Sequence, residues 1–308
     1  MGNEAEGDKQ MAKRGKNINV FLMDGTADGR IKCTLANWTG VAYRIPRVAL
    51  DSCKERGDLK QSGIYFLFGV SDETSEPVIY VGQAGIRKNG EGILYRLQEH
   101  RKNPDKDYWS EAVVFTTSNN SFGPTEISYL ENRFCALATD ARRYIVKNEN
   151  EPTQGNVTEE KESELEEFIE YAKIIMGVLG HKVFEPLIAV DSNMDNDSKN
   201  TSVSSARTVF YIKKRGANAR AVQTADGFIV LSGSIISKDP VPSCPNSALT
   251  AREKYKENID DHMQLLKDVP FKTPSGAAAF VLGSSVNGNI AWTTEQGVTF
   301  GQFESEAI

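Results

Sequence analysis

The chain contains 308 residues with a formal net charge of −6; 39% of the residues are hydrophobic and 25% are charged. This composition is typical of a folded protein and excludes a disordered one, and the length suffices for about two domains. No apolar run approaches the ~20 residues that a membrane-spanning helix needs, and residues 1–17 lack the apolar core of a secretory signal. We therefore expect neither an integral membrane protein nor a secreted one.

The four cysteines, Cys33, Cys53, Cys135 and Cys244, are widely spaced and form no C-x-x-C motif. This spacing disfavours both a disulfide scaffold and a zinc site built from thiolates, and free thiols are typical of the reducing cytoplasm. With only three histidines in the chain, a multi-histidine metal site would need nearly all of them. We therefore expect a cytoplasmic protein without a zinc centre.

The negative charge is concentrated in one segment. Residues 151–200 hold 4 Lys and Arg against 12 Asp and Glu, a net charge of −8, whereas residues 1–150 and 201–308 each carry a net charge of +1. Local basic surfaces can therefore form on either side of the acidic segment. The overall charge neither favours nor excludes a nucleic acid as the partner.

The first half of the chain has the pattern of a small antiparallel sheet with helices. A polar, glycine-containing stretch predicts a disordered tail over residues 1–17, and short apolar runs between turn signals predict a β-rich lead-in over residues 18–60. Residues 63–82 have the pattern of a β-hairpin with a polar turn. Apolar spacing then predicts a helix through His100, a strand at residues 113–115 and a helix capped by Thr125.

The second half has the pattern of a long helix, a linker and a small α+β domain. Thr158 is placed to cap a long acidic helix that Gly180 ends, within a segment of residues 156–190. Residues 191–206 are polar and predict a linker. A separate C-terminal domain over residues 207–308 is expected to contain these elements: strands at 209–212 and 228–231, a helix at 247–268 and a short buried helix at 275–282.

The predicted hairpin carries two short motifs, Gly63-Ile64-Tyr65 and Tyr80-Val81-Gly82. Together with later residues on predicted helices, they resemble the GIY-YIG nuclease family over roughly residues 61–150, and we place the nuclease domain at residues 61–155. The positions that carry the resemblance are Tyr65, Tyr80, Arg96, His100, Glu131 and Asn148. Residues 225–300 also resemble a domain of unknown function that follows some bacterial members of this family.

The resemblance implies a metal-dependent endonuclease with an α+β fold, a small antiparallel sheet flanked by helices. Glu131 would bind Mg²⁺ or Mn²⁺, because a lone carboxylate suits a cation that keeps most of its waters. Arg96 would stabilise the phosphate charge, and Tyr65 would be the general base. Forming a phenolate at pH 7 costs about 4 kcal/mol, which Arg96, the metal or a relay through His100 would have to lower.

The remaining positions of the resemblance have supporting roles. Tyr80 would orient the water or Tyr65, and Asn148 would be a scaffold for the glutamate helix or for the hairpin.

Three details stay open on residue patterns alone. The hairpin register decides whether the two tyrosines share a face. Glu126 and Glu131 lie at similar angles from the apolar stripe of their helix, so only the resemblance favours Glu131. Asn150 lies two residues after Asn148 and is an alternative to it.

The expected partner is DNA, with no membrane partner. One site per chain means that cutting both strands requires a homodimer or two visits. The basic side chains expected to contact phosphates are Arg44, Arg47, Arg87, Lys88, Arg101, Lys213, Lys214 and Arg215. The alternatives are a non-catalytic nucleic-acid-binding module, which would retain DNA without a metal, and a protein-interaction module, which would form a protein complex and have no DNA affinity.

Overall fold

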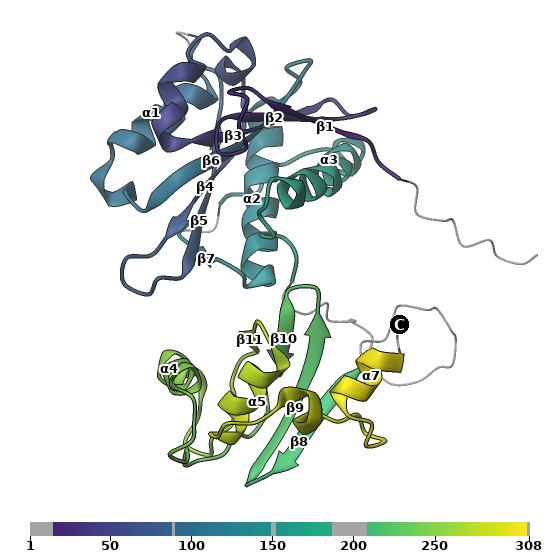
Figure 1. Ribbon diagram of the computed structural model, residues 1–308. Coiled ribbons are helices and arrows are strands. Elements are labelled where there is room, and N and C mark those ends of the chain that lie inside the picture. Colours follow the sequence, from purple (N-terminus) through teal and green to yellow (C-terminus); the bar gives the residue numbers. More distant parts are fainter. Residues whose placement is uncertain (1–14, 88–89, 149–151, 187–207, 307–308) are drawn as a thin grey trace, which may run out of the picture. The chain divides into compact units, whose positions relative to one another are not determined.

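The computed structural model describes residues 15–87, 90–148, 152–186 and 208–306, and its chain forms two compact units (Figure 1). The first unit extends to Pro186 and the second begins at Leu187. Most of the predicted tail and the whole predicted linker, residues 191–206, lie outside the described residues. The segments predicted as a lead-in and as an acidic helix belong to the first unit together with the nuclease-like segment. The fold is α+β in both units, as predicted.

The first unit is built on one seven-stranded sheet with the order β1-β2-β3-β6-β4-β5-β7. The bounds of the strands are β1 (Ile18–Leu22), β2 (Ile31–Leu35), β3 (Gly40–Pro46), β4 (Gly63–Val70), β5 (Pro77–Ala84), β6 (Trp109–Thr117) and β7 (Ile145–Val146). Every neighbouring pair is antiparallel except β5 and β7. The predicted hairpin, β4 and β5, therefore lies between β6 and the short edge strand β7.

Helices cover both faces of this sheet around the hairpin. The bounds are α1 (Ile93–Lys102), α2 (Pro124–Ala141) and α3 (Glu159–Val178), with short 3-10 helices η1 (Arg47–Cys53), η2 (Gly57–Lys60) and η3 (Pro104–Lys106). Tyr65 and Leu67 on β4 pack in a core with α1, whereas Ile64 and Phe66 pack in a second core with α2 and α3. Strand side chains alternate between faces, so a strand buried on both sides has a continuous apolar run.

The predicted N-cap of α3 is confirmed, whereas the predicted N-cap of α2 is wrong. Thr158 caps α3, because its side chain accepts a hydrogen bond from the Lys161 backbone N–H, and Gly180 follows the helix with a φ of 96°. Thr125 does not cap α2. That helix begins one residue earlier, at Pro124, whose fixed φ is already helical and whose missing N–H would have had no partner.

The second unit contains a four-stranded sheet with the order β11-β10-β9-β8. The bounds are β8 (Val209–Lys214), β9 (Ala217–Thr224), β10 (Gly227–Val230), β11 (Val269–Phe271), α4 (Asn246–Lys254), η4 (Lys256–Asn258), α5 (Pro274–Leu282), α6 (Gly288–Ala291) and α7 (Phe300–Glu306). Helix α5 is the buried helix expected at residues 275–282, and its residues from Ala277 to Leu282 are buried. Strand β8 is an edge strand of this sheet.

The helix predicted at residues 247–268 is wrong beyond Lys254. The chain turns instead around Asp260, whose side chain accepts hydrogen bonds from the backbone N–H groups of His262 and Gln264. Met263 between them has a φ of 62°, which no α-helix allows. An aspartate that bonds the backbone two residues ahead favours a turn over a helix, and this local bond outweighs the apolar spacing.

Two general expectations can be examined in the structure. All four cysteines lie in the described part of the chain, and each is a buried free thiol. Across the described residues, no helix is both long enough and apolar enough to traverse a lipid bilayer.

A charged cluster joins the end of α3 to the sheet. Glu111 on β6 lies 2.6 Å from the Arg44 guanidinium on β3 and 3.1 Å from the His181 imidazole that follows α3. The His181 ring stacks on Phe68 of β4 with 3.7 Å between ring centroids. The close contact with the His181 imidazole, together with the hydrogen bond from Arg44, outweighs burial and lowers the pKa of Glu111 to about 2.

We expect this cluster to make folding stability depend on acid pH through Glu111. Because the folded pKa lies below the ordinary value of 4.5, the carboxylate stabilises the fold above that value, and the stabilisation is lost as the pH falls toward about 2. Glu111→Gln should lower the free energy of unfolding near neutral pH by about 2 kcal/mol and flatten its decline between about pH 5 and pH 2.5. Urea unfolding at several pH values measures this. Glu73→Gln, in the exposed turn after β4, is the control, and an equal decline in both variants would contradict the expectation.

Candidate active site on the β4–β5 hairpin

The register of the hairpin places the two motif tyrosines on the same face of the sheet. Tyr65 on β4 is paired with Gly82 on β5, and Tyr80 lies two residues before Gly82 on the same strand. Because strand side chains alternate, Tyr80 is a diagonal neighbour of Tyr65 on that face. Their ring centroids are 6.3 Å apart. The register, which the residue pattern left open, therefore brings the two phenols together.

The Tyr65 ring lies directly over Gly82 and leaves no space for a side chain at that position. A Cβ atom at this position would overlap the hydroxyl and the ring of Tyr65. Gly63, the first residue of the other motif, is similarly restricted, since a Cβ there would overlap the Phe115 carbonyl on β6 and the Ile93 side chain of α1. Both motif glycines therefore have a packing reason: one makes room for Tyr65 and the other for helix α1.

Helix α1 adds His100 to the two phenols. The His100 Nε2 atom lies 2.7 Å from the Tyr65 hydroxyl, and the imidazole ring is 5.3 Å from the Tyr65 ring and 5.4 Å from the Tyr80 ring. Burial, with the positive charges of Lys106 and Arg96, lowers the pKa of His100 to about 3. The imidazole is therefore neutral at physiological pH, so one of its ring nitrogens is a hydrogen-bond acceptor.

Arg96 lies one turn before His100 on α1, and an ion pair holds its guanidinium. Its Nη1 atom lies 2.9 Å from a carboxylate oxygen of Glu99, and Glu99 also pairs with Arg87 at 2.9 Å. Burial, the dominant cause, and the nearby Tyr80 raise the pKa of Tyr65, and the Arg96 charge opposes this rise. The Arg96 guanidinium is therefore close enough to stabilise a negative charge that forms on the phenol.

Glu131 approaches the same group of side chains from α2. The Gln83 amide of β5 donates a hydrogen bond of 2.9 Å to its Oε2 atom. Burial raises the pKa of Glu131, and its carboxylate in turn contributes to the raised pKa values of Tyr65 and Tyr80. Glu126, the alternative on the same helix, instead acts electrostatically on Lys161 of α3. The structure therefore separates two glutamates that the helical pattern could not, and it places Glu131 beside the phenols.

Asn148 braces the hairpin through the strand that carries Tyr80. Its side chain accepts a hydrogen bond from the Val81 N–H at 3.1 Å and donates one to the Val81 carbonyl at 2.8 Å. These two bonds continue the pairing of β5 beyond the end of β7, where Lys147 donates to the Ile79 carbonyl. Asn148 thus has the geometry of the scaffold expected of it, whereas Asn150 lies outside the described residues.

Two further charged residues, Lys106 and Glu99, lie at the site and were not expected from the sequence. The Lys106 ammonium lies 3.2 Å from the centroid of the Tyr80 ring. Its charge adds to the burial that lowers the pKa of His100 and opposes the burial that raises the pKa of Glu131. It comes from η3, a short turn that begins with Pro104. No sequence signal marks this lysine, because its place depends on how the turn after α1 folds back. The position of Glu99, three residues after Arg96, could have indicated the ion pair.

Three of the basic residues expected to contact phosphates, Arg44, Arg47 and Arg101, have partners within the first unit. Arg44 pairs with Glu111, and Arg101 pairs with Asp51 at 3.0 Å. Arg47 donates three hydrogen bonds to backbone carbonyls around the end of α1 and the start of β6. These guanidinium groups therefore have structural contacts that phosphate binding would have to share or replace.

The other predicted phosphate contacts differ in their surroundings. Arg87 pairs with Glu99 at the edge of the candidate site, and Lys88 lies outside the described residues. Lys213, Lys214 and Arg215 are exposed at the turn between β8 and β9 in the second unit. The candidate site and this cationic turn therefore belong to different units.

The site offers one carboxylate to a metal ion. Within the described residues, no group of three or more His, Cys, Asp or Glu side chains could enclose a metal. Glu131 is half-buried, and burial raises its pKa, although the Gln83 hydrogen bond and the charges of Arg96 and Lys106 oppose the rise. A divalent cation at its second oxygen would relieve that cost, and a hydrated Mg²⁺ needs only one or two carboxylates. The donor set therefore fits Mg²⁺ or Mn²⁺ better than Zn²⁺.

Comparison with known proteins finds a similarity within the second unit. A family described as a domain of unknown function (DUF4357) matches residues 210–304. This segment contains residues 225–300, for which the sequence predicts a domain of unknown function. The chain has no match among curated proteins and none among solved structures.

The contact between Tyr65 and Gly82 predicts that a methyl group added at position 82 destabilises the fold. Gly82→Ala should lower the free energy of unfolding by about 1–3 kcal/mol and displace Tyr65, because the added carbon overlaps its ring. Gly85→Ala is the control, since a Cβ there meets only the Ile127 side chain at an ordinary distance of 3.7 Å. Urea unfolding compares the two variants, and equal stability would show that the Tyr65 ring does not need this glycine.

Proposed function

We propose that this protein is a metal-dependent endonuclease that hydrolyses phosphodiester bonds in DNA. The observation that carries the proposal is the convergence of five side chains around the β4–β5 hairpin. These side chains, from two strands and two helices, are Tyr65, Tyr80, Arg96, His100 and Glu131, which are linked by a direct contact or by their effects on one another's pKa. This constellation supports the resemblance to GIY-YIG nucleases and gives each of its residues a chemical role.

Tyr65 is the general base in this proposal, and His100 receives its proton. Burial raises the pKa of Tyr65, so a free phenolate is not available at neutral pH. A neutral His100 with its Nε2 atom 2.7 Å away can accept the phenolic proton while Tyr65 takes one from the attacking water. The two transfers occur together, and no isolated phenolate has to form in the buried site.

Tyr80 connects this proton path to solvent. Tyr65 is 1% exposed, whereas Tyr80 is only half-buried, so Tyr80 lies on the solvent side of the site, where it can hold the attacking water within reach of the Tyr65 hydroxyl. The Lys106 ammonium on its ring makes Tyr80 a better hydrogen-bond donor, because a nearby cation draws electron density from the hydroxyl. Tyr80 therefore orients the water, and Arg96 stabilises the phosphate oxygens as they gain charge.

Glu131 would hold the divalent cation, with Gln83 fixing its orientation. When bound, Mg²⁺ or Mn²⁺ would neutralise phosphate charge and stabilise the leaving oxygen. In the absence of substrate, Arg96 is paired with Glu99. Binding of a phosphate would compete with Glu99 for the guanidinium, so Glu99 keeps Arg96 in place between turnovers.

The roles of the two phenols can be separated by removing one oxygen at a time. Tyr65→Phe should reduce nicking of supercoiled plasmid with Mg²⁺ by at least about 100-fold, because the proton acceptor is lost. Tyr80→Phe should reduce it less, since it removes only orientation of the water. Tyr144→Phe, which removes a phenol packed on Phe68 in the opposite core, is the control. Undiminished nicking by Tyr65→Phe would refute its role as the base.

Glu131 can be tested by its effect on metal dependence. Glu131→Gln keeps the shape of the side chain but removes its charge, so we expect loss of Mg²⁺-dependent cleavage and of the metal's effect on thermal stability. Glu126→Gln on the same helix is the matched control and should retain both. Cleavage that persists in a chelator, or equal metal response in the two variants, would contradict a metal site at Glu131.

Parallel cleavage reactions with different nucleic acids identify the class of substrate. Single-stranded DNA, duplex DNA and RNA of equal length separate the nucleic-acid classes, and a steep dependence of double-strand cutting on protein concentration would indicate a homodimer. Metal-independent retention of DNA without cleavage would instead favour the non-catalytic binding module.

A further inference from the structure

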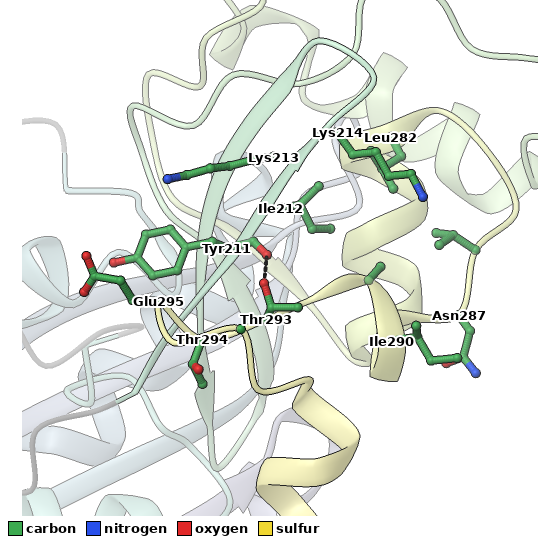
Figure 2. Close-up of a pocket in the computed structure, with 13 residues that line it drawn as sticks. Tyr211, Ile212, Lys213, Lys214, Leu282, Asn287, Ile290, Thr293, Thr294 and Glu295 are labelled. Atoms are coloured by element: carbon green, nitrogen blue, oxygen red, sulfur yellow. Dashed lines mark hydrogen bonds between the residues drawn. The ribbon is translucent and has the colours of Figure 1, made fainter.

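The second unit has an open slot along the edge of its sheet. The slot has a volume of about 540 Å³ and lies between the edge strand β8 and the segment that includes α6 and residues 293–297 (Figure 2). This volume is in the range of roughly 300–1,000 Å³ that is usual for ligand-binding clefts. None of the residues of the proposed nuclease site contributes to it, because all of them belong to the first unit.

One residue on the outer edge of β8, Tyr211, is already hydrogen-bonded to another segment. Tyr211 donates its N–H to the Thr293 carbonyl at 2.7 Å and accepts the Thr293 N–H at 3.1 Å, so the outward groups of this residue are satisfied. On the inner side β8 is paired with β9, with Lys213 opposite Asn218. Because the outward direction recurs every second residue, the N–H and carbonyl of Lys213 point outward in the same way as those of Tyr211.

The pairing stops at Lys213. Asn218, its neighbour on β9, exchanges both backbone hydrogen bonds with Ile235, which is possible only if Asn218 faces away from β8. Within the described residues, the Lys213 N–H and carbonyl have no hydrogen-bond partner. The unpaired N–H and carbonyl of Lys213 therefore face the slot, two residues along β8 from the hydrogen-bonded pair of Tyr211 and Thr293.

The two sides of the slot differ in chemistry. On one side of β8 lie Ile212, Leu282 and Ile290, and the Ile290 side chain is 67% exposed (Figure 2). On the other side lie Tyr211 and Lys213, with Lys213 Nζ 5.6 Å from the Tyr211 ring centroid. A strand placed in the slot would therefore meet an apolar surface with alternate side chains and a polar surface with the others.

The charges that line the slot are mainly positive. Lys213 and Lys214 lie on opposite sides of β8, and exposed Arg215 follows them. Glu295 contributes one negative charge beside the Tyr211 ring, on the same side of β8 as Lys213 and opposite Lys214, so the lining carries two lysines against one glutamate (Figure 2). The open end of the edge therefore favours an acidic occupant.

We propose that the slot binds an extended peptide segment of a partner protein, which adds to β8 as a further strand. Its backbone would exchange hydrogen bonds with Lys213, its alternate apolar side chains would lie against Ile212, Leu282 and Ile290, and its intervening acidic side chains would face Lys213. The open backbone pair favours a peptide over a nucleic acid, because a strand satisfies both groups at the spacing of β8. The inference is independent of the proposed nuclease activity.

The test uses the full chain and a fluorescent six-residue peptide that alternates glutamate and valine. Two N-methylated isomers serve as internal controls: one is methylated at every valine nitrogen and the other at every glutamate nitrogen. Alternate residues of a strand direct their N–H groups to opposite edges, so only one set of amides can face β8. We expect the parent peptide to bind, one isomer to bind at least about tenfold more weakly, and the other to bind like the parent.

Variants locate the binding at the slot. Ile290→Glu should weaken the parent peptide by at least about tenfold, because it places a negative charge on the apolar side. Leu249→Glu, at an exposed position on α4 away from the slot, is the matched control and should bind normally. Both changes are at exposed side chains, so folding is retained. Hydrogen exchange of the Lys213 amide should slow when the peptide binds.

Three results would overturn the proposal. They are absence of peptide binding, equal affinity of both N-methylated isomers with the parent, and binding that leaves the Lys213 amide unprotected. Displacement of the peptide by a six-nucleotide oligothymidylate, with affinity lost in Ile290→Glu, would identify the slot as a nucleic-acid site instead. Loss of nuclease activity in Tyr65→Phe has no bearing on these results, so the two proposals fail separately.

Discussion

The burial of one strand on both faces is the constraint on which the first unit depends. Strand β4 is an interior strand of the sheet, between β6 and β5, with α1 on one face and α2 and α3 on the other. Tyr65 can enter the α1 core only because Gly82 opposite has no side chain, and α1 can approach the sheet only because Gly63 has none. Two residues without a Cβ therefore set the positions of the phenol and of the helix that brings His100 to it.

The same burial gives the candidate site its electrostatic character. Removal from water raises the pKa values of Tyr65 and Glu131 and lowers that of His100, so each of the three is held toward its neutral form. Cations oppose part of this effect on the acids, namely Arg96 near Tyr65 and Lys106 near Glu131. Groups in such a balance respond strongly to an added charge, which is the property that a phosphate and a metal ion would use.

In the second unit, the edge strand β8 is only partly covered by other backbone segments of the chain. Strand β8 has one outward residue, Tyr211, paired with Thr293, and the next outward residue, Lys213, open beside a slot with an apolar side. Open edges invite association with other chains, and lysines on the edge reduce indiscriminate pairing because like charges repel a second copy. An edge that is half closed and positively charged is selective for a strand of opposite charge. These features of the edge are the basis for the peptide site that we propose in the second unit.

Local patterns along the chain account for the helices and strands around the candidate site and for the chemical types of its side chains. Apolar alternation and turn residues specify the β4–β5 hairpin, and the capping threonine and terminal glycine specify α3, because these signals act within a few residues. Contacts between distant segments place Tyr65 and Tyr80 on one face, bring Glu131 rather than Glu126 near them, and put Lys106 on the Tyr80 ring. Register, helix rotation and the path of a turn depend on contacts between residues far apart in the chain, and no local pattern encodes them.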